Sequence, residues 1–157
     1  MQTIARLLGV VWMVSCTASV AVGGPLENLA GHWSGWGVLS TTSGTNEQMK
    51  CVTTYQIADD GNSARQSFRC ASSSYRFDAR ISYKVSVGQV SGTWRERLYS
   101  AGGTLSGQLT RAGLSAKFNS DTISGQISIT TTGCRQTIEI RPSMIEIARM
   151  SVKVSNC

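Results

Sequence analysis

The sequence contains one histidine, His32, among its 157 residues. A Ser-His-Asp or Cys-His arrangement would need it as the base, and a haem or zinc site would need it as an imidazole ligand. In an alternating segment that begins at His32, the histidine falls on the opposite face from Trp33. Because Trp33 is the better core candidate, we expect His32 to be an ordinary surface residue.

Cysteines are the next residue type that could carry chemistry. Cys16 lies in the N-terminal segment described below, and the other four are Cys51, Cys70, Cys134 and Cys157. No two of them have the close spacing of a zinc knuckle. An even number of cysteines in an exported chain is typical of disulfides. We therefore expect two disulfide bonds, with neither a thiol nucleophile nor a metal site.

Carboxylates could support hydrolysis if two of them faced one bond. Asp59 and Asp60 stand next to each other before Gly61, where aspartate is favoured by turn geometry. No glycine-rich phosphate loop is apparent, and Gly102-Gly103 is typical of a turn. These observations predict a protein that is not an enzyme and uses no cofactor.

The N-terminal segment has the layout of a secretory signal peptide. Arg6 precedes the apolar run Leu7–Val14, which is followed by small residues as far as Gly23. We predict a signal peptide over residues 1–23 and a single domain over residues 24–157, located in the periplasm or secreted. A lipoprotein anchored through Cys16 is the alternative, because the preceding Met13-Val14-Ser15 resembles a degenerate lipobox. No other stretch is long and apolar enough to cross a membrane.

The rest of the chain has the patterning of β-strands. With 41% hydrophobic and 15% charged residues, it is too apolar for a disordered chain. Apolar and polar residues alternate strictly over Ser74–Val87, which predicts a long antiparallel strand with one face on a core. Gly88-Gln89 then predicts a two-residue turn that pairs Val87 with Val90 and directs Glu96 inward.

A second hairpin is predicted around Asp60-Gly61, a strong turn signal. Its register places Cys51 directly opposite Cys70, at a separation that a disulfide tolerates. Cys134 and Cys157 are then paired by elimination.

The remaining segments repeat this pattern of short strands and tight turns. We count eight to ten strands and at most one helical turn, at Pro25–Ala30. The even spacing favours an all-β fold, an antiparallel up-and-down β-barrel, with a β-sandwich as the alternative. The further strands expected are His32–Ser40, Thr104–Leu109, Leu114–Asn119, Ile123–Thr131, Cys134–Arg141 and Ile145–Ser155.

A short motif resembles a known family. The Gly31-His32-Trp33 segment at the start of the first strand is similar to the Gly-x-Trp of calycin barrels, which include lipocalins, avidins and nitrobindin-like proteins. The resemblance implies that Trp33 closes one end of the barrel against a neighbouring strand. The residues from Arg69 to Asp78 also resemble small exported proteins of alpha-proteobacteria that have no assigned function.

Two binding hypotheses follow. The first is an exported, non-catalytic barrel that holds a small apolar ligand, with Glu96 as a polar anchor that would itself need a proton, a cation or a ligand partner. Its cavity candidates are Tyr55, Phe68, Phe77, Tyr83, Trp94 and Glu96. The same residues could instead fill a core that holds no ligand.

The second hypothesis is an envelope interaction protein or periplasmic enzyme inhibitor that meets an anionic partner through a basic outer face. This face would place Arg80 opposite Arg97. Its members are Arg76, Arg80, Lys84, Arg95 and Arg97. The cations are not interleaved with aromatic residues, which argues against nucleic acid as the partner.

Overall fold

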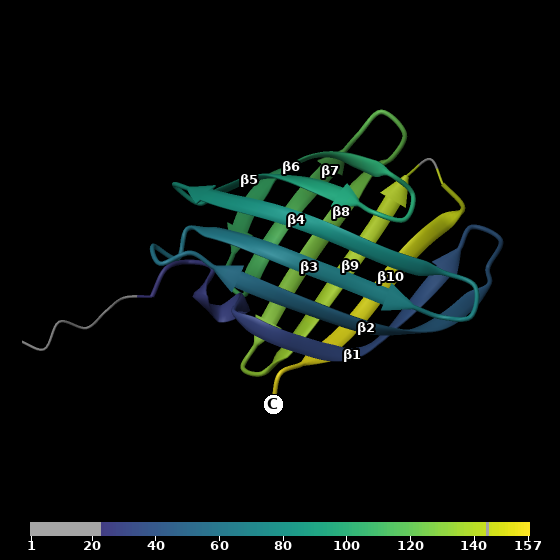
Figure 1. The fold of residues 1–157 in the computed structure, drawn as a ribbon, viewed down its shortest axis with the longest axis horizontal. Coiled ribbons are helices and arrows are strands. Elements are labelled where there is room, and N and C mark those ends of the chain that lie inside the picture. The colour runs from purple at the N-terminus through teal and green to yellow at the C-terminus, as the bar shows by residue number, and fades with distance from the viewer. Residues whose placement is uncertain (1–22, 144) are drawn as a thin grey trace, which may run out of the picture.

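Ten antiparallel strands close into one barrel in the computed structural model, which describes residues 23–143 and 145–157 (Figure 1). The predicted signal peptide, apart from Gly23, and the alternative lipid site at Cys16 lie outside the described residues. No helix among the described residues is long and apolar enough to cross a membrane.

Each strand pairs with its neighbours in sequence, and β10 pairs with β1 to close the sheet. The predicted up-and-down barrel is therefore confirmed, and the sandwich alternative is wrong. The elements are the 3-10 turn η1 (Glu27–Leu29) and the strands β1 (Gly31–Thr41), β2 (Asn46–Ile57), β3 (Ser63–Ala71), β4 (Arg76–Ser86), β5 (Gln89–Glu96), β6 (Ala101–Thr110), β7 (Gly113–Asn119), β8 (Ser124–Thr132), β9 (Arg135–Ser143) and β10 (Ile147–Ser155).

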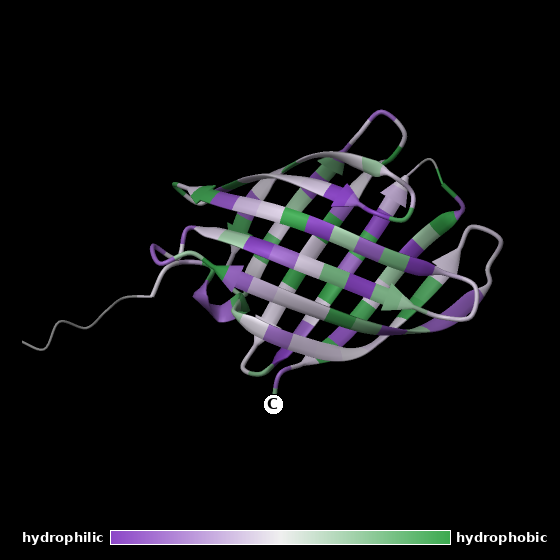
Figure 2. Ribbon diagram, viewed as in Figure 1, coloured by the Kyte–Doolittle hydropathy of each residue, from purple (hydrophilic) through white to green (hydrophobic). Residues whose placement is uncertain are grey.

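Alternation along the strands determines which side chains form the interior. Figure 2 shows hydrophilic and hydrophobic positions succeeding one another along many of the strands. On β2, Met49, Cys51 and Tyr55 are buried, whereas Lys50 points outward. Because successive side chains of a strand lie on opposite faces, this pattern gives the barrel an apolar lumen and a polar outer surface.

The two ends of the barrel differ. One end is closed by η1 and the start of β1, where Leu26, Leu29 and Trp33 are almost fully buried. The indole Nε1–H of Trp33 donates to the carbonyl of Leu29 at 2.9 Å, so this buried donor is satisfied. The other end is surrounded by the loops that follow β1, β3, β5, β7 and β9.

Both expected disulfides are present. Cys51 and Cys70 are partners across β2 and β3, as the predicted register requires, and their Cα atoms are 4.2 Å apart. This bond lies inside the barrel, and a Cβ atom added at Gly37 would lie 3.4 Å from the Cys51 Sγ atom. Cys134 and Cys157 join the β8–β9 turn to the end of the chain, with Cα atoms 5.6 Å apart.

The predicted register of the β4–β5 hairpin is wrong by two residues. The turn is Val87-Gly88, and Val85 faces Val90, so the alternation is preserved although every pair changes. Ala79 faces Glu96, and Leu98 lies beyond the end of β5. In the observed register Tyr83 faces Gly92, whereas the predicted one would have opposed it to Trp94. A Cβ atom added at Gly92 would collide with the Ser82 carbonyl oxygen, so the backbones of β4 and β5 approach closely at this point.

Val87 provides a test of this turn. Its φ angle is +50°, in the region that a β-branched residue rarely adopts, and its side chain is 98% exposed. Because the Val87 side chain contributes little packing, Val87→Asn should raise the free energy of unfolding by about 0.5–1 kcal/mol by relieving this strain. Urea unfolding measures the change. Val87→Asn with unchanged or lower stability would contradict the observed turn.

Candidate ligand cavity

The barrel contains a cavity of about 440 Å³ near its open end. Its walls come from β3–β10 and from the loops at that end, and most of its lining side chains are aliphatic or aromatic. The lining residues are Gln66, Phe68, Tyr75, Phe77, Ala79, Ile81, Trp94, Glu96, Tyr99, Ala101, Leu105, Phe118, Thr122, Ile123, Ile127, Ile140, Pro142, Ile145, Glu146, Ile147 and Met150.

Aromatic rings form much of the cavity wall. Trp94 on β5 meets Phe118 on β7 edge to face, with ring centroids 5.7 Å apart. Phe77 and Tyr99 form a second, tilted pair at 6.4 Å. The Trp94 Nε1–H is buried and has no hydrogen-bond partner among the described residues. A buried unpaired donor is costly, so it indicates a place where a ligand atom or a water molecule accepts a hydrogen bond.

A layer of hydrogen-bonded polar side chains crosses the barrel near the inner end of the cavity. Gln66 is central: its Nε2 donates to Thr53 Oγ1 and to the Tyr55 hydroxyl, both at 3.0 Å, and its Oε1 accepts from the Tyr83 hydroxyl. The Tyr55 hydroxyl donates at 2.9 Å to Gln136, whose Nε2 donates in turn to Thr131 Oγ1. The layer therefore joins β2, β3, β4, β8 and β9 through the interior.

Two tyrosines of this layer make stability depend on pH. Burial raises the pKa of Tyr55 and, even more clearly, that of Tyr83 above the ordinary phenol value of 10.0. A pKa that is higher in the folded state leaves stability intact below pH 10 and removes it as pH rises further. The free energy of unfolding should therefore fall by about 1.4 kcal/mol per pH unit for each tyrosine. Urea unfolding between about pH 8 and pH 11.5 measures this slope, and a flat profile above pH 10 would contradict the prediction.

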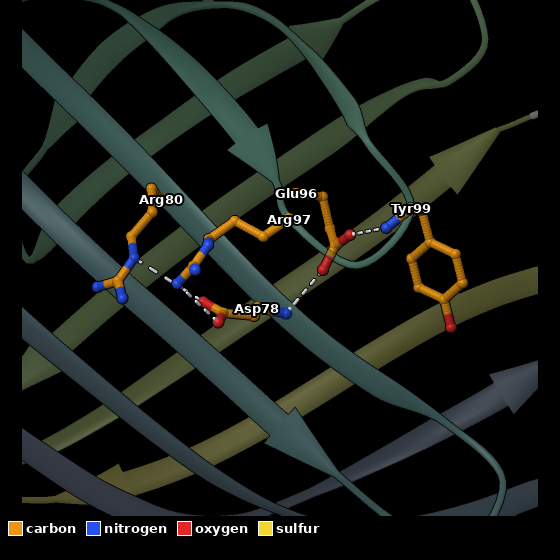
Figure 3. Close-up of polar contacts among 5 residues, drawn as sticks. All are labelled: Asp78, Arg80, Glu96, Arg97 and Tyr99. Atoms are coloured by element: carbon orange, nitrogen blue, oxygen red, sulfur yellow. Dashed lines mark hydrogen bonds and ion pairs between the residues drawn. The ribbon is translucent and has the colours of Figure 1, made fainter.

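Glu96 points inward and is buried, as the sequence predicted, but its partners are backbone groups (Figure 3). Its Oε1 accepts from the Asp78 N–H at 2.7 Å, and its Oε2 accepts from the Tyr99 N–H at 2.6 Å. The carboxylate thus fixes the loop between β5 and β6 to the start of β4. Two backbone N–H groups therefore take the place of the cation or ligand that the sequence analysis expected beside this carboxylate.

The rim of the cavity is held by contacts between loops. The Tyr75 hydroxyl, in the β3–β4 loop, donates to Glu146 Oε1 in the β9–β10 loop at 3.2 Å. Glu47 on β2 accepts from Ser73 Oγ and from the Ser74 N–H. Hydrogen bonds from the Ser72 side chain and the Ser74 backbone lower the pKa of Glu47 to about 2. The β3–β4 loop is therefore anchored at two points of the rim.

The six predicted cavity residues divide into two groups. Phe68, Phe77, Trp94 and Glu96 line the cavity, whereas Tyr55 and Tyr83 belong to the polar layer. The prediction missed the rim and wall residues Tyr75, Tyr99, Phe118, Ile145 and Glu146, among others. Tyr75 shares the alternating apolar face of Phe77, so the sequence did carry a signal for it. Most of the others lie in loops or on strands whose inward face was not assigned, where alternation gave no direct signal.

The basic outer face is larger than the sequence predicted. Arg80 is opposite Arg95, and the expected pairing with Arg97 is wrong because the register differs by two residues. Arg97 and Arg80 lie 3.4 and 3.8 Å from the Asp78 carboxylate, respectively (Figure 3). Pairing of β3 with β4 adds Arg65 and Arg69 to this face. The cations predicted from the sequence were Arg76, Arg80, Lys84, Arg95 and Arg97.

The other residues that could carry chemistry, His32 and the possible metal ligands, do not form a site. His32 is exposed, and its Nδ1 lies 3.0 Å from Thr54 Oγ1. Within residues 23–143 and 145–157, no three His, Cys, Asp or Glu side chains are grouped to hold a metal ion.

The fold and the cavity together define a closed antiparallel barrel with an internal apolar site open at one end. The solved structure of the S-type phycobiliprotein lyase CPES from Guillardia theta is similar, with a TM-score of 0.54 over 84% of this chain and 90% of that chain. The two sequences are 12% identical, so the likeness shows the fold alone. It supports the expected barrel architecture. No family model matches the chain, and no curated protein is significantly similar to it.

Proposed function

We propose that this protein binds a small, mainly apolar molecule inside the barrel and does not transform it. The observation that carries the proposal is the cavity of about 440 Å³, which is of the size that accepts small ligands. Side chains can fill the interior of a small barrel completely. Here they fill the end near Trp33 and Leu29 and leave the other end open.

The lining suggests the chemistry of the ligand. An apolar body would lie between the aromatic and aliphatic walls, and one acceptor atom would take the free Nε1–H of Trp94. Groups at the rim would meet the Glu146 carboxylate and the Tyr75 hydroxyl. Glu96, whose oxygens already accept two backbone hydrogen bonds, would shape the wall rather than anchor the ligand.

The comparison does not extend to an activity. The similar protein is, by its name, a phycobiliprotein lyase, and one fold supports many unrelated activities. We therefore assign binding and no lyase chemistry to this chain. Two disulfides indicate an oxidising compartment outside the cytoplasm. Together with the predicted signal peptide, they support a periplasmic or secreted location.

Native mass spectrometry tests the proposal. The protein is exported by a bacterial host, purified without denaturation and measured before and after addition of N-phenyl-1-naphthylamine, a neutral apolar probe. We expect an adduct that leaves on denaturation, or one-to-one binding of the probe to the empty protein. Protein that carries no adduct and binds no probe would overturn the proposal. The denatured mass also reports the cleavage site and any lipid on Cys16.

A second candidate function uses the basic outer face. The observation that favours it is the addition of Arg65 and Arg69 to the predicted cations, where Asp78 is the one carboxylate that the described strands β3–β5 place among them. We propose an anionic envelope component or protein as the partner of this face. Arg80→Glu combined with Arg95→Glu should abolish capture of such a partner from an envelope extract and leave binding of the naphthylamine probe unchanged. Unchanged capture would exclude this candidate.

A further inference from the structure

Trp36 is an exposed tryptophan in the middle of a strand. It lies on β1, and 56% of its surface is accessible. The neighbouring Gly35 and Gly37 lie on the inward side of the strand, where an added Cβ would collide with β10. Trp36 is therefore not needed to complete the core, and packing gives no reason for a large apolar side chain here.

The strand register places a lysine on each side of Trp36. Lys153 on β10 and Lys50 on β2 are both its direct partners, and both are exposed. Side chains at directly opposed positions have Cβ atoms about 4.5–5.5 Å apart. The row continues from Lys50 through Ala71 to Arg76. One indole therefore stands between two cations, and a third cation lies farther along the same row.

The surface around Trp36 is hollowed and polar at its edges. A shallow depression of about 560 Å³ contains Trp36, Gly35 and Gly37, and Lys153 contributes to its wall. The bordering residues are the exposed Val38 and the polar Ser40, Gln48, Arg149 and Ser151. Arg149 is held by Glu139 at 2.7 Å, whereas neither Lys50 nor Lys153 forms an ion pair with any described residue. The two lysines are thus available to an external anion.

We propose that this depression binds an acidic carbohydrate. The C–H face of a sugar ring would stack on the Trp36 indole, and its carboxylate or sulfate groups would pair with Lys50 and Lys153. Gln48 would meet the hydroxyl groups, and the oxygens of Ser40 and Ser151, whose own hydroxyls donate to Asn46 and Glu139, would accept from them. A single-stranded nucleic acid would need further exposed rings for successive bases, and a membrane surface would need a broad apolar face. The site is on the outside of the barrel and does not depend on the cavity.

Isothermal titration calorimetry with oligogalacturonate and with a heparin oligosaccharide tests the proposal. We expect one of these probes to bind, and Trp36→Ala to weaken that binding by about tenfold or more. Lys50→Gln combined with Lys153→Gln should weaken it similarly. The matched control is Lys117→Gln combined with Arg111→Gln, which removes the same charge from exposed positions on β7 and in the turn before it and should change the affinity by less than about twofold. Trp36→Phe should retain part of the affinity.

Polyglutamate separates this site from general attraction to a basic protein. We expect it to bind more weakly than the acidic sugar and to be insensitive to Trp36→Ala. Equal binding of polyglutamate, an unchanged sugar affinity in folded Trp36→Ala, or no binding of either sugar to the unaltered protein would each overturn the proposal. None of these outcomes affects the cavity, which the naphthylamine probe reports separately.

Discussion

Ala79→Trp should abolish binding of N-phenyl-1-naphthylamine, or weaken it by about tenfold or more, while the barrel remains folded. Ala79 lines the cavity on β4, where its Cα partners are Phe68 on β3 and Glu96 on β5. An indole at this position would occupy the volume that an apolar probe needs. Fluorescence titration of the probe gives the affinity, and circular dichroism with urea unfolding shows whether the variant is folded.

The matched control is Ser82→Trp, which puts the same side chain on the outer face of β4. It should leave the probe affinity unchanged. Because an indole at position 79 has to fit beside Phe68, a second blocking variant, Ile140→Trp, approaches the cavity from β9. If both blocking variants fold and bind the probe as tightly as the unaltered protein, the probe lies elsewhere and the proposed ligand site is wrong.

The two predicted hairpins show where strand register can be derived from sequence. Around Asp60-Gly61, the opposed cysteines Cys51 and Cys70 supplied an independent check on the turn, and that register is confirmed. Around Gly88 no such check was available. A shift of two residues keeps every side chain on the same face, so alternation alone cannot distinguish the two registers.

The polar layer could have been predicted from the sequence, whereas the cavity could not. The predicted register already placed Gln66 opposite Tyr55, an expected interior residue, so Gln66 had to point inward as well. A buried glutamine needs partners, and this requirement predicts a hydrogen-bonded group. The volume of the cavity depends on how ten strands close and on where loops such as that of Tyr75 lie. Neither is visible in the alternation of a single strand.

Gln66→Leu should lower the free energy of unfolding by about 2–4 kcal/mol. Gln66 is only 2% exposed and makes hydrogen bonds with Thr53, Tyr55 and Tyr83. Leucine has a similar size but leaves the Tyr83 hydroxyl without its acceptor and removes a donor from the other two residues. Urea unfolding at neutral pH measures the loss. Gln126→Leu, at an exposed position on β8, is the control and should stay within about 0.5 kcal/mol.

A double-mutant cycle then separates hydrogen bonding from packing. Tyr83→Phe alone should cost about 1–3 kcal/mol, because it leaves one oxygen lone pair of Gln66 without its donor in a buried site. With Gln66→Leu already present, the same substitution removes an orphaned hydroxyl and should cost much less, or even restore stability. Additive losses would mean that the two residues do not act through their shared hydrogen bond. The polar layer would then stabilise the barrel by volume alone.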